Sequence, residues 1–404
     1  MSLKENLSFA GLSKMIYLGI DLINERWPKK FEKARVGILV HSASVNRDLR
    51  YSWEVFWDFK RAKLCSIFGP QHGLFGETQA NMVEWEGYKD PFTGLTVYSL
   101  YGKVRKPTPE MLRDIDGVVV DLQDVGSRYY TYIWTLYLVM EACLENNKFV
   151  VVLDRPNPIS GDFIEGFVLK ERFSSFVGLR PLPVRHGMTI GELALYFRDF
   201  YLKGLDLFVI KMDGWRRSLF WDDTGLEWVN PSPNMPSLKA ALLYPGMCLL
   251  ESTNISEGRG TTRPFEVFGA PFIEPCRLAR ELNSMGLEGV YFRPFFFIPT
   301  FDKYCGQRCG GVHIHIINKY KVKPFKVGVA ILKALMDLYP GDFKWAEGPY
   351  EYEYEKKPID ILAGTDELRH DLESGKSIDE LEVKWQGEEK GFNENIRKNY
   401  LIYD

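Results

Sequence analysis

Five apolar runs, each followed by polar residues, constrain the fold of this chain more than any other feature of its sequence. Helix-compatible segments, such as residues 109–114 and 132–146, lie between them. Apolar strands that alternate with helices are typical of a parallel sheet with helices on both faces. We therefore predict an α/β fold built on a Rossmann-like, doubly wound parallel sheet. Its strands are expected at residues 36–40, 64–68, 95–100, 117–120 and 149–153.

The length of the chain favours two domains. A chain of 404 residues is longer than one hydrophobic core usually organises, and its 45% of hydrophobic residues is a globular composition. The alternation of strands and helices changes at about residue 163. We predict a Rossmann-like domain over residues 1–185, which carries most candidate catalytic residues. A smaller α+β domain over residues 186–404 is expected to complete a cleft.

Charge and segment composition exclude several classes of function. A net charge of -3 at pH 7 gives no basic field, so we expect no nucleic-acid partner. No G-x-G-x-x-G follows the first strand and no Walker-type phosphate loop occurs, which argues against nucleotide binding. No run approaches the roughly 18–20 apolar residues of a membrane span. We expect a cytoplasmic protein, although a signal peptide already removed would leave no trace. The oligomeric state is unknown.

The cysteines and histidines do not form a metal-binding pattern. Six cysteines are scattered through the chain rather than arranged as a disulfide framework. Cys305 and Cys309 precede His313 and His315, but no second cysteine pair follows, and zinc sites normally show tighter ligand spacing. The alternating sequence predicts a strand with both imidazoles on one face. We therefore predict no metal and no organic cofactor.

The most informative loop follows the second predicted strand and contains Gln71, His72 and Glu77 among three glycines and a proline. In an open α/β sheet, ligands bind outside the carboxyl ends of the strands, where this loop would lie. A tight turn with a structural histidine is the alternative. The neighbouring aspartates could likewise cap loops, and Asp154 could form a local ion pair with Arg155. The polar residues expected at this edge are His41, Gln71, His72, Asp121, Gln123, Asp124, Asp154 and Arg155.

Loops in the second half of the chain could form the opposite wall. Thr189, with Glu192 three residues later, predicts a capped helix just after His186. Three prolines stiffen residues 230–236, and residues 253–262 combine polar groups with flexible glycines. Both loops suit contact with a ligand.

Six motifs follow one another along the chain: Gly-Pro-Gln-His-Gly (69–73), Asp-Leu-Gln-Asp-Val-Gly-Ser-Arg (121–128), Asp-Arg-Pro-Asn-Pro (154–158), His-Gly-Met-Thr (186–189), Ser-Pro-Asn-Met-Pro (232–236) and Asn-Ile-Ser-Glu-Gly-Arg-Gly-Thr-Thr (254–262). Together they resemble the NamZ (YbbC-like) family. Its members are exo-β-N-acetylmuramidases, which release N-acetylmuramic acid from the non-reducing ends of peptidoglycan fragments. The resemblance implies a Rossmann-like domain joined to a smaller domain, with the active site between them and a peptidoglycan-derived sugar as substrate.

Two places depart from the family pattern: residues 41–44 read His-Ser-Ala-Ser where relatives resemble Thr-Asn-Pro-Ala, and the other departure bears on catalysis. Relatives carry a proposed catalytic glutamate in a Pro-Glu-His-Gly version of the first motif, where this chain has Gln71. A carboxamide cannot act as a general acid, and glycoside hydrolysis ordinarily uses two carboxyl groups. Glu77 could supply the missing carboxyl, or Asp121 or Asp124 could do so. Alternatively, the protein binds a muramyl sugar without cleaving it, or hydrolyses another amino sugar.

Among these hypotheses we favour hydrolysis. Glu77 is expected to be the acid or base if burial raises its pKa. Arg128 or Arg155 is expected to pair with the lactyl carboxylate of muramic acid. The predicted catalytic residues are Glu77, Gln71, His72, Asp121 and Asp124. The predicted substrate-binding residues are Arg128, Asp154, Arg155, His186, Asn234, Asn254, Ser256, Glu257 and Arg259.

Overall fold

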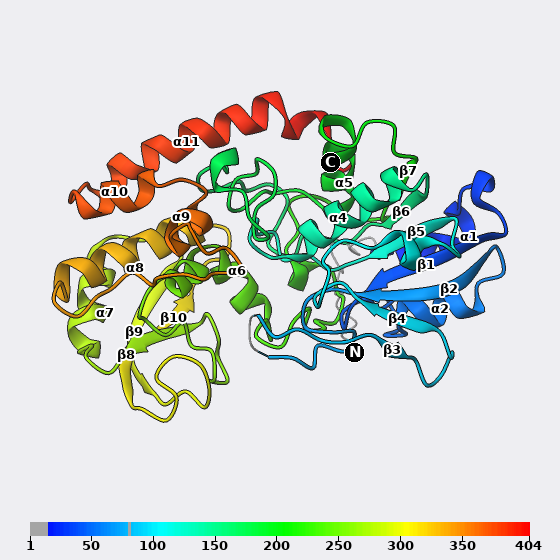
Figure 1. The fold of residues 1–404 in the computed structure, drawn as a ribbon. Coiled ribbons are helices and arrows are strands. Elements are labelled where there is room, and N and C mark those ends of the chain that lie inside the picture. The colour runs from blue at the N-terminus through cyan, green and yellow to red at the C-terminus, as the bar shows by residue number, and fades with distance from the viewer. Residues whose placement is uncertain (1–14, 80–81) are drawn as a thin grey trace, which may run out of the picture.

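The computed structural model describes residues 15–79 and 82–404, which form two lobes (Figure 1). The larger lobe contains a seven-stranded sheet in the order β3-β4-β2-β1-β5-β6-β7. The five apolar runs become β1, β2, β4, β5 and β6, so the predicted Rossmann-like α/β fold is confirmed. The strands are β1 (Ala34–Val40), β2 (Ala62–Gly69), β3 (Tyr88–Lys89), β4 (Thr96–Ser99), β5 (Gly117–Asp121), β6 (Phe149–Leu153) and β7 (Leu207–Ile210).

The strand order reverses at the middle of this sheet. β1 pairs in parallel with both β2 and β5. The chain adds β4 beyond β2, and β6 and β7 beyond β5, all in parallel, whereas β3 is antiparallel at the edge. Such a reversal opens a crevice at the carboxyl ends of the central strands. The loops that follow β1, β2 and β5 therefore lie where a ligand is expected.

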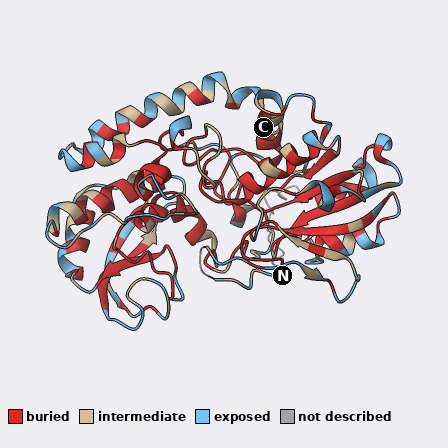
Figure 2. Cartoon of the chain, in the orientation of Figure 1, coloured by how far each residue is buried: buried red, intermediate tan, exposed pale blue. Residues whose placement is uncertain are grey.

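Helices cover both faces of the sheet. They are α1 (Ile23–Arg26), α2 (Ser52–Asp58), α3 (Pro109–Leu112), α4 (Tyr132–Glu145) and α5 (Ile190–Phe200). Val118 and Val120 of β5 pack in the core that contains α4 and α5, whereas Val119 packs with α1 and α2. Every residue of β5 and β6 is buried, and Figure 2 shows these strands at the centre of the lobe. This double cover explains why the strands are apolar throughout.

The smaller lobe is built on an antiparallel sheet in the order β8-β10-β9. The larger lobe still includes α5 and β7, so it extends beyond residue 185, the boundary predicted from the sequence. The elements of the smaller lobe and of the C-terminal segment are α6 (Leu238–Met247), β8 (Val267–Ala270), α7 (Pro275–Ser284), β9 (Val290–Phe297), β10 (Cys309–Ile316), α8 (Pro324–Leu338), α9 (Pro358–Ala363), α10 (Glu367–Glu373) and α11 (Ile378–Asn395).

The C-terminal segment returns to the larger lobe. α11 runs along both lobes (Figure 1), and the carboxylate of Glu389 accepts a hydrogen bond from the backbone N–H of Gly166 at 2.7 Å. Beyond α11, the hydroxyl of Tyr403 donates to Oδ2 of Asp154 at 2.6 Å. The two lobes are thus connected both through the segment between β7 and α6 and through the C-terminal segment.

His313 and His315 lie on one face of β10, as the alternating sequence predicts, with ring centroids 4.0 Å apart. The guanidinium of Arg293 lies beside both rings, with nitrogen–nitrogen distances of 3.1 Å. In the described part of the chain, no group of three or more His, Cys, Asp or Glu residues is placed to hold a metal ion. None of the helices in residues 15–79 and 82–404 is both long and apolar enough to cross a membrane.

A buried ion pair joins the carboxyl ends of β5 and β6. Asp121 ends β5 and is fully buried, and Arg155 lies just after β6. The guanidinium donates from Nε to Oδ1 at 2.5 Å and from Nη2 to Oδ2 at 2.7 Å. Arg155 also donates to the carbonyl of Val45 at 2.7 Å, and the hydroxyl of Ser52 donates to the Asp121 carboxylate. The pair therefore fixes the segments that follow β1, β5 and β6.

Replacing Asp121 with alanine should lower the free energy of unfolding by about 3–5 kcal/mol, because Arg155 would stay buried without a counter-charge. Urea unfolding followed by tryptophan fluorescence measures the loss. Asp58→Ala is a matched control, since Asp58 forms an exposed ion pair with Arg50. The free energy of unfolding of Asp58→Ala should fall by less than about 1 kcal/mol. Equal losses in the two variants would contradict the role given to Asp121.

Candidate functional site

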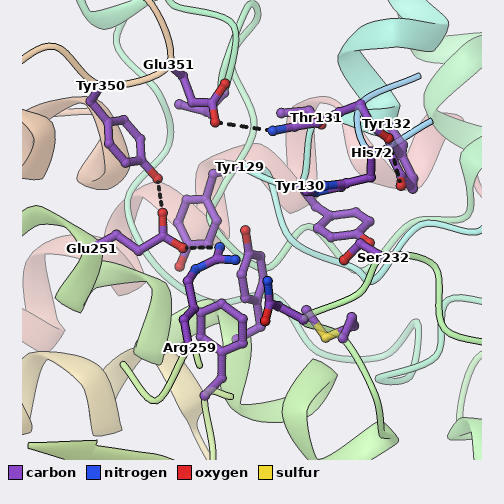
Figure 3. A pocket seen from close by; sticks show the side chains of 16 residues that line it. His72, Tyr129, Tyr130, Thr131, Tyr132, Ser232, Glu251, Arg259, Tyr350 and Glu351 are labelled. Atoms are coloured by element: carbon purple, nitrogen blue, oxygen red, sulfur yellow. Dashed lines mark hydrogen bonds and ion pairs between the residues drawn. The ribbon is translucent and has the colours of Figure 1, made fainter. Parts of the chain in front are cut away.

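The two lobes meet at a narrow pocket that is partly open to solvent and is lined by residues of both lobes. Figure 3 shows Thr131, Tyr132 and His72 on one side of the pocket and Glu251, Arg259 and Tyr350 on the other. The lining residues are Gln71, His72, Tyr129, Tyr130, Thr131, Tyr132, Val177, Ser232, Asn234, Met235, Tyr244, Glu251, Arg259, Phe265, Tyr350 and Glu351.

The loop after β2 supplies Gln71 to the pocket. Thr131, at the start of α4, donates from Oγ1 to Gln71 Oε1 at 2.6 Å, which fixes the orientation of the amide. The amide nitrogen of Gln71 then donates to the hydroxyl of Tyr101 at 3.0 Å and to Oε1 of Glu351 at 3.3 Å. Gln71 is therefore held as a donor that faces a carboxyl group of the other lobe.

His72, the next residue, is a neutral member of the same loop. Its backbone is left-handed, with φ of 74°, which is uncommon for a residue other than glycine. Its Nδ1 lies 2.7 Å from the carbonyl oxygen of Thr78, so Nδ1 carries the proton. Burial lowers the pKa of His72 to about 4, because the charged imidazolium would be poorly solvated. At pH 7 the ring is uncharged, and Nε2 is available as an acceptor.

On the smaller lobe, Glu251 forms an ion pair with Arg259. Oε1 of Glu251 accepts from Arg259 Nη2 at 2.7 Å, and Oε2 accepts from the hydroxyl of Tyr350 at 2.7 Å (Figure 3). Burial by itself would raise the pKa of Glu251, but the guanidinium and the hydroxyl outweigh burial and lower that pKa. Glu251 is therefore ionised at neutral pH.

Besides Glu251, Arg259 lies close to the carboxylate of Glu257. The distance from Arg259 Nε to Glu257 Oε1 is 3.2 Å, and Lys303 donates to Glu257 Oε2 at 3.1 Å. Burial raises the pKa of Glu257, although Lys303 and Arg259 act in the opposite direction. Glu257 does not line the pocket, so it acts on the site through Arg259.

Glu351 brings a second carboxyl group to the pocket, and its hydrogen-bond donors are uncharged. Its Oε2 accepts from the hydroxyl of Tyr101 at 2.7 Å, and its Oε1 accepts from Gln71. Burial, together with the nearby charge of Glu251, raises the pKa of Glu351, although the two hydrogen bonds and the charge of Arg105 act in the opposite direction. Glu351 and Tyr352 both have left-handed backbones, with φ of 45° and 65°. Such conformations cost about 1–3 kcal/mol each and cluster at functional sites.

Four residues predicted from the sequence line this pocket: Gln71, His72, Asn234 and Arg259. Asn234 donates from Nδ2 to the carbonyl oxygen of Gln79 at 2.8 Å, which joins the proline-rich segment to the loop after β2. The structure thus brings Gln71 of the larger lobe and Arg259 of the smaller lobe into one pocket, although they lie far apart in the sequence.

Glu77 lies outside the pocket lining and is exposed. Its Oε2 accepts from the backbone N–H of Phe75 at 3.1 Å, so the carboxylate stabilises a turn of its own loop. The expectation that Glu77 supplies the acid depends on burial, and the structure corrects it.

The predicted aspartates and His186 support the edge of the sheet from outside the pocket lining. Asp121 is neutralised by Arg155. Asp124 accepts from the backbone N–H of Gly126 at 2.7 Å, and its Oδ2 lies 3.1 Å from His186 Nε2. We therefore place no proton transfer on Asp121 or Asp124.

Arg128, Arg155 and Asp154 are also bound away from the pocket. With Arg155 held by Asp121, and Arg128 fully buried, neither arginine reaches the pocket. Asp154 accepts from the backbone N–H of Gly191 at 2.8 Å, at the start of α5. This corrects the expected pairing of Arg128 or Arg155 with a substrate carboxylate. Arg128 donates instead to the carbonyl oxygens of Phe167, Leu182 and Leu362.

Asn254 and Ser256 bind the backbone close to their own loop. Asn254 donates from Nδ2 to the carbonyl oxygen of Asp342 at 2.8 Å, and Ser256 Oγ accepts from the N–H of Gly258 at 3.2 Å. Neither residue lines the pocket, so they shape the loop that carries Arg259.

The sequence did not identify the carboxyl groups that do line the pocket. Glu351 is 280 positions from Gln71, and no motif marks it. Glu251 lies in a short 3-10 helix, Cys248–Ser252, that the sequence did not indicate. The sequence contained one indication of Tyr129, Tyr130 and Tyr132, because they follow closely on the motif at positions 121–128.

Comparisons with known proteins agree over nearly the whole chain. The model for the N-terminal part of exo-beta-N-acetylmuramidase NamZ matches residues 36–239, and the model for its C-terminal part matches residues 242–403. A peptidoglycan beta-N-acetylmuramidase NamZ of Bacillus subtilis (strain 168) is 44% identical over 388 residues, which cover 96% of this chain and 91% of the relative. Crystal structures of two DUF1343 family proteins from Bacteroides fragilis have TM-scores of 0.86 and 0.75 at 34% and 28% identity, each covering 96% of this chain and 99% of the relative.

Replacing Arg259 with glutamine should destabilise the protein more at pH 8 than at pH 5. The variant leaves Glu251 and Glu257 buried without their shared cation, so the pKa of each should lie above its unfolded value. Such carboxyls favour folding less as the pH rises through the folded pKa. We expect the free energy of unfolding to fall by about 3 kcal/mol at pH 8 and by less at pH 5. Urea unfolding at both pH values measures the difference.

Arg263→Gln is the matched control, because Arg263 is half exposed and lies 3.5 Å from Glu266. This variant should change the free energy of unfolding by less than about 1 kcal/mol at both pH values. A loss for Arg259→Gln that does not depend on pH would contradict the electrostatic role of Arg259.

Proposed function

Because the chain belongs to the NamZ family of exo-β-N-acetylmuramidases, we propose that it hydrolyses the β-glycosidic bond of N-acetylmuramic acid at the non-reducing ends of peptidoglycan fragments. The observation that carries this proposal is the pair of carboxyl groups, Glu251 and Glu351, in one pocket between the lobes. Glycoside hydrolysis ordinarily needs two such groups. The carboxamide of Gln71 therefore does not leave the pocket without an acid.

Aromatic rings give the pocket surfaces suited to a sugar. Tyr130, Tyr244 and Phe265 line it and contact one another edge to face, with ring centroids 5.8 Å and 4.9 Å apart. Aromatic faces can cover the apolar C–H groups of a pyranose, while tyrosine hydroxyls offer hydrogen bonds. The pocket thus combines aromatic surface with many polar groups that can orient a ligand.

Arg259 is the group we assign to the lactyl carboxylate of muramic acid. It is the one lysine or arginine among the lining residues that the structure describes. A guanidinium carries five N–H donors in a planar fork. Arg259 can therefore bind a substrate carboxylate while it stays paired with Glu251. N-acetylglucosamine lacks the lactyl group, so this contact would favour muramic acid over that sugar.

The purified protein should release nitrophenol from para-nitrophenyl β-N-acetylmuramide and much less from the corresponding glucosaminide. Arg259→Lys should reduce the ratio of the two kcat/KM values about 10-fold to 100-fold, since a charge-assisted hydrogen bond contributes about 1.5–3 kcal/mol. Arg263→Lys, outside the pocket lining, should leave the ratio unchanged.

Other outcomes of this assay separate the alternatives. Preference for the glucosaminide would identify a glycosidase for another amino sugar. A wild type that binds N-acetylmuramic acid but releases no nitrophenol, together with an active Gln71→Glu variant, would identify a binding protein that has lost hydrolytic activity.

A further inference from the structure

We infer that Glu351 is the proton-donating catalytic residue of this pocket, and that Gln71 and Tyr101 are positioning residues that hold its carboxyl group. The inference rests on the proposed hydrolysis of a muramyl glycoside. It assigns the acid to a residue that no motif marks.

The two carboxyl groups that line the pocket have opposite surroundings. Glu251 is bound to the guanidinium of Arg259, which keeps it ionised. Among the described residues, Glu351 forms no ion pair within 4.0 Å, and its hydrogen bonds come from the neutral donors Tyr101 and Gln71. The charges of Arg105, which lowers its pKa, and of Glu251, which raises it, act in opposite directions. A glycosidase needs one protonated and one ionised carboxyl group, and neighbours that separate the two pKa values identify which is which. By this criterion Glu351 is the acid.

The contacts of Glu351 fix its position from both sides. Oε2 accepts from Tyr101 at 2.7 Å and Oε1 accepts from Gln71 Nε2 at 3.3 Å. Gln71 is itself oriented by Thr131, which donates to its amide oxygen at 2.6 Å. The left-handed backbone of Glu351 shows that the loop holds this residue in an unfavourable conformation, as at functional sites.

The carboxamide at position 71 suits this arrangement. A glutamate at that position would place a second carboxyl group about as close to Glu351 as the Gln71 amide now lies, at 3.3 Å. Two carboxyl groups at this distance share one proton, and the pair then titrates as a unit. Gln71 donates an N–H instead, so Glu351 titrates as a single acid.

The proposed step conserves atoms and charge. The Glu351 carboxylic acid gives its proton to the glycosidic oxygen as the bond from that oxygen to C1 of the muramyl residue breaks. Water supplies the hydroxyl group that ends on C1, and the remaining proton of that water restores the acid. The products are free N-acetylmuramic acid and the shortened glycan.

Glu351→Gln tests the assignment through its dependence on the leaving group. On N-acetylmuramyl-β-1,4-N-acetylglucosamine, whose leaving alcohol needs a proton, kcat should fall about 10²-fold to 10⁴-fold with KM little changed. The leaving group of para-nitrophenyl β-N-acetylmuramide, nitrophenolate, leaves more readily without a proton. On this substrate the factor by which kcat falls should be at least tenfold smaller. Glu355→Gln, an exposed change in the same segment, should leave both rates unchanged.

Tyr101→Phe provides a second test through the pH profile. The hydroxyl of Tyr101 lowers the pKa of Glu351, so its removal should raise that pKa and shift the alkaline limb of kcat to higher pH. A purely structural tyrosine would lower activity without moving this limb.

The outcomes separate the inference from the proposed function. A wild type that hydrolyses neither substrate overturns both. An active wild type with equal losses on the two substrates for Glu351→Gln, or with an unmoved alkaline limb for Tyr101→Phe, overturns the assignment of Glu351 alone.

Discussion

The buried ion pair between Asp121 and Arg155 is the interaction on which the geometry of the site depends. It connects the ends of two central strands and holds the segment after β1 through the carbonyl of Val45. Next to it, burial lowers the pKa of His41 to about 3, and its neutral ring accepts from the backbone N–H of Gln123 at 2.8 Å. The ring of His41 in turn packs against Tyr132, which lines the pocket, with ring centroids 4.7 Å apart.

Two identical side chains acquire different properties in this pocket because their neighbours differ. Burial acts on both Glu251 and Glu351 and disfavours the charge on each. A guanidinium compensates for burial at Glu251, whereas a phenol and an amide compensate only partly at Glu351. The larger lobe contributes the amide and the phenol, and the smaller lobe contributes both carboxyl groups. The chemistry of the site therefore exists only where the lobes meet.

The sequence predicted the sheet well and the site only in part. Apolar runs fully buried on both faces have few alternatives to a parallel sheet, so β1, β2, β4, β5 and β6 could be placed correctly. The N-terminal cap of α5 at Thr189 could also be predicted, because it depends on Glu192, only three residues further along the chain. The polar residues after each strand could not be sorted in this way. Asp121 ends β5 and Gln71 follows β2, the two strands on either side of β1, but Asp121 is paired with a buried arginine whereas Gln71 faces the pocket. Partners of this kind come from distant segments, and the partner of Gln71 comes from the far end of the chain.

The contacts of the C-terminal segment have a consequence for the order in which the protein can mature during its synthesis. Asp154 and Glu192 belong to the larger lobe, yet Asp154 accepts from Tyr403, and Glu192 accepts from the backbone N–H of Ile402 at 2.9 Å. When the ribosome has made the seven-stranded sheet, these two buried carboxylates still lack part of their hydrogen bonding. The larger lobe can reach its final packing only after nearly two hundred further residues have been added, so the nascent sheet must persist for that interval in an incomplete form.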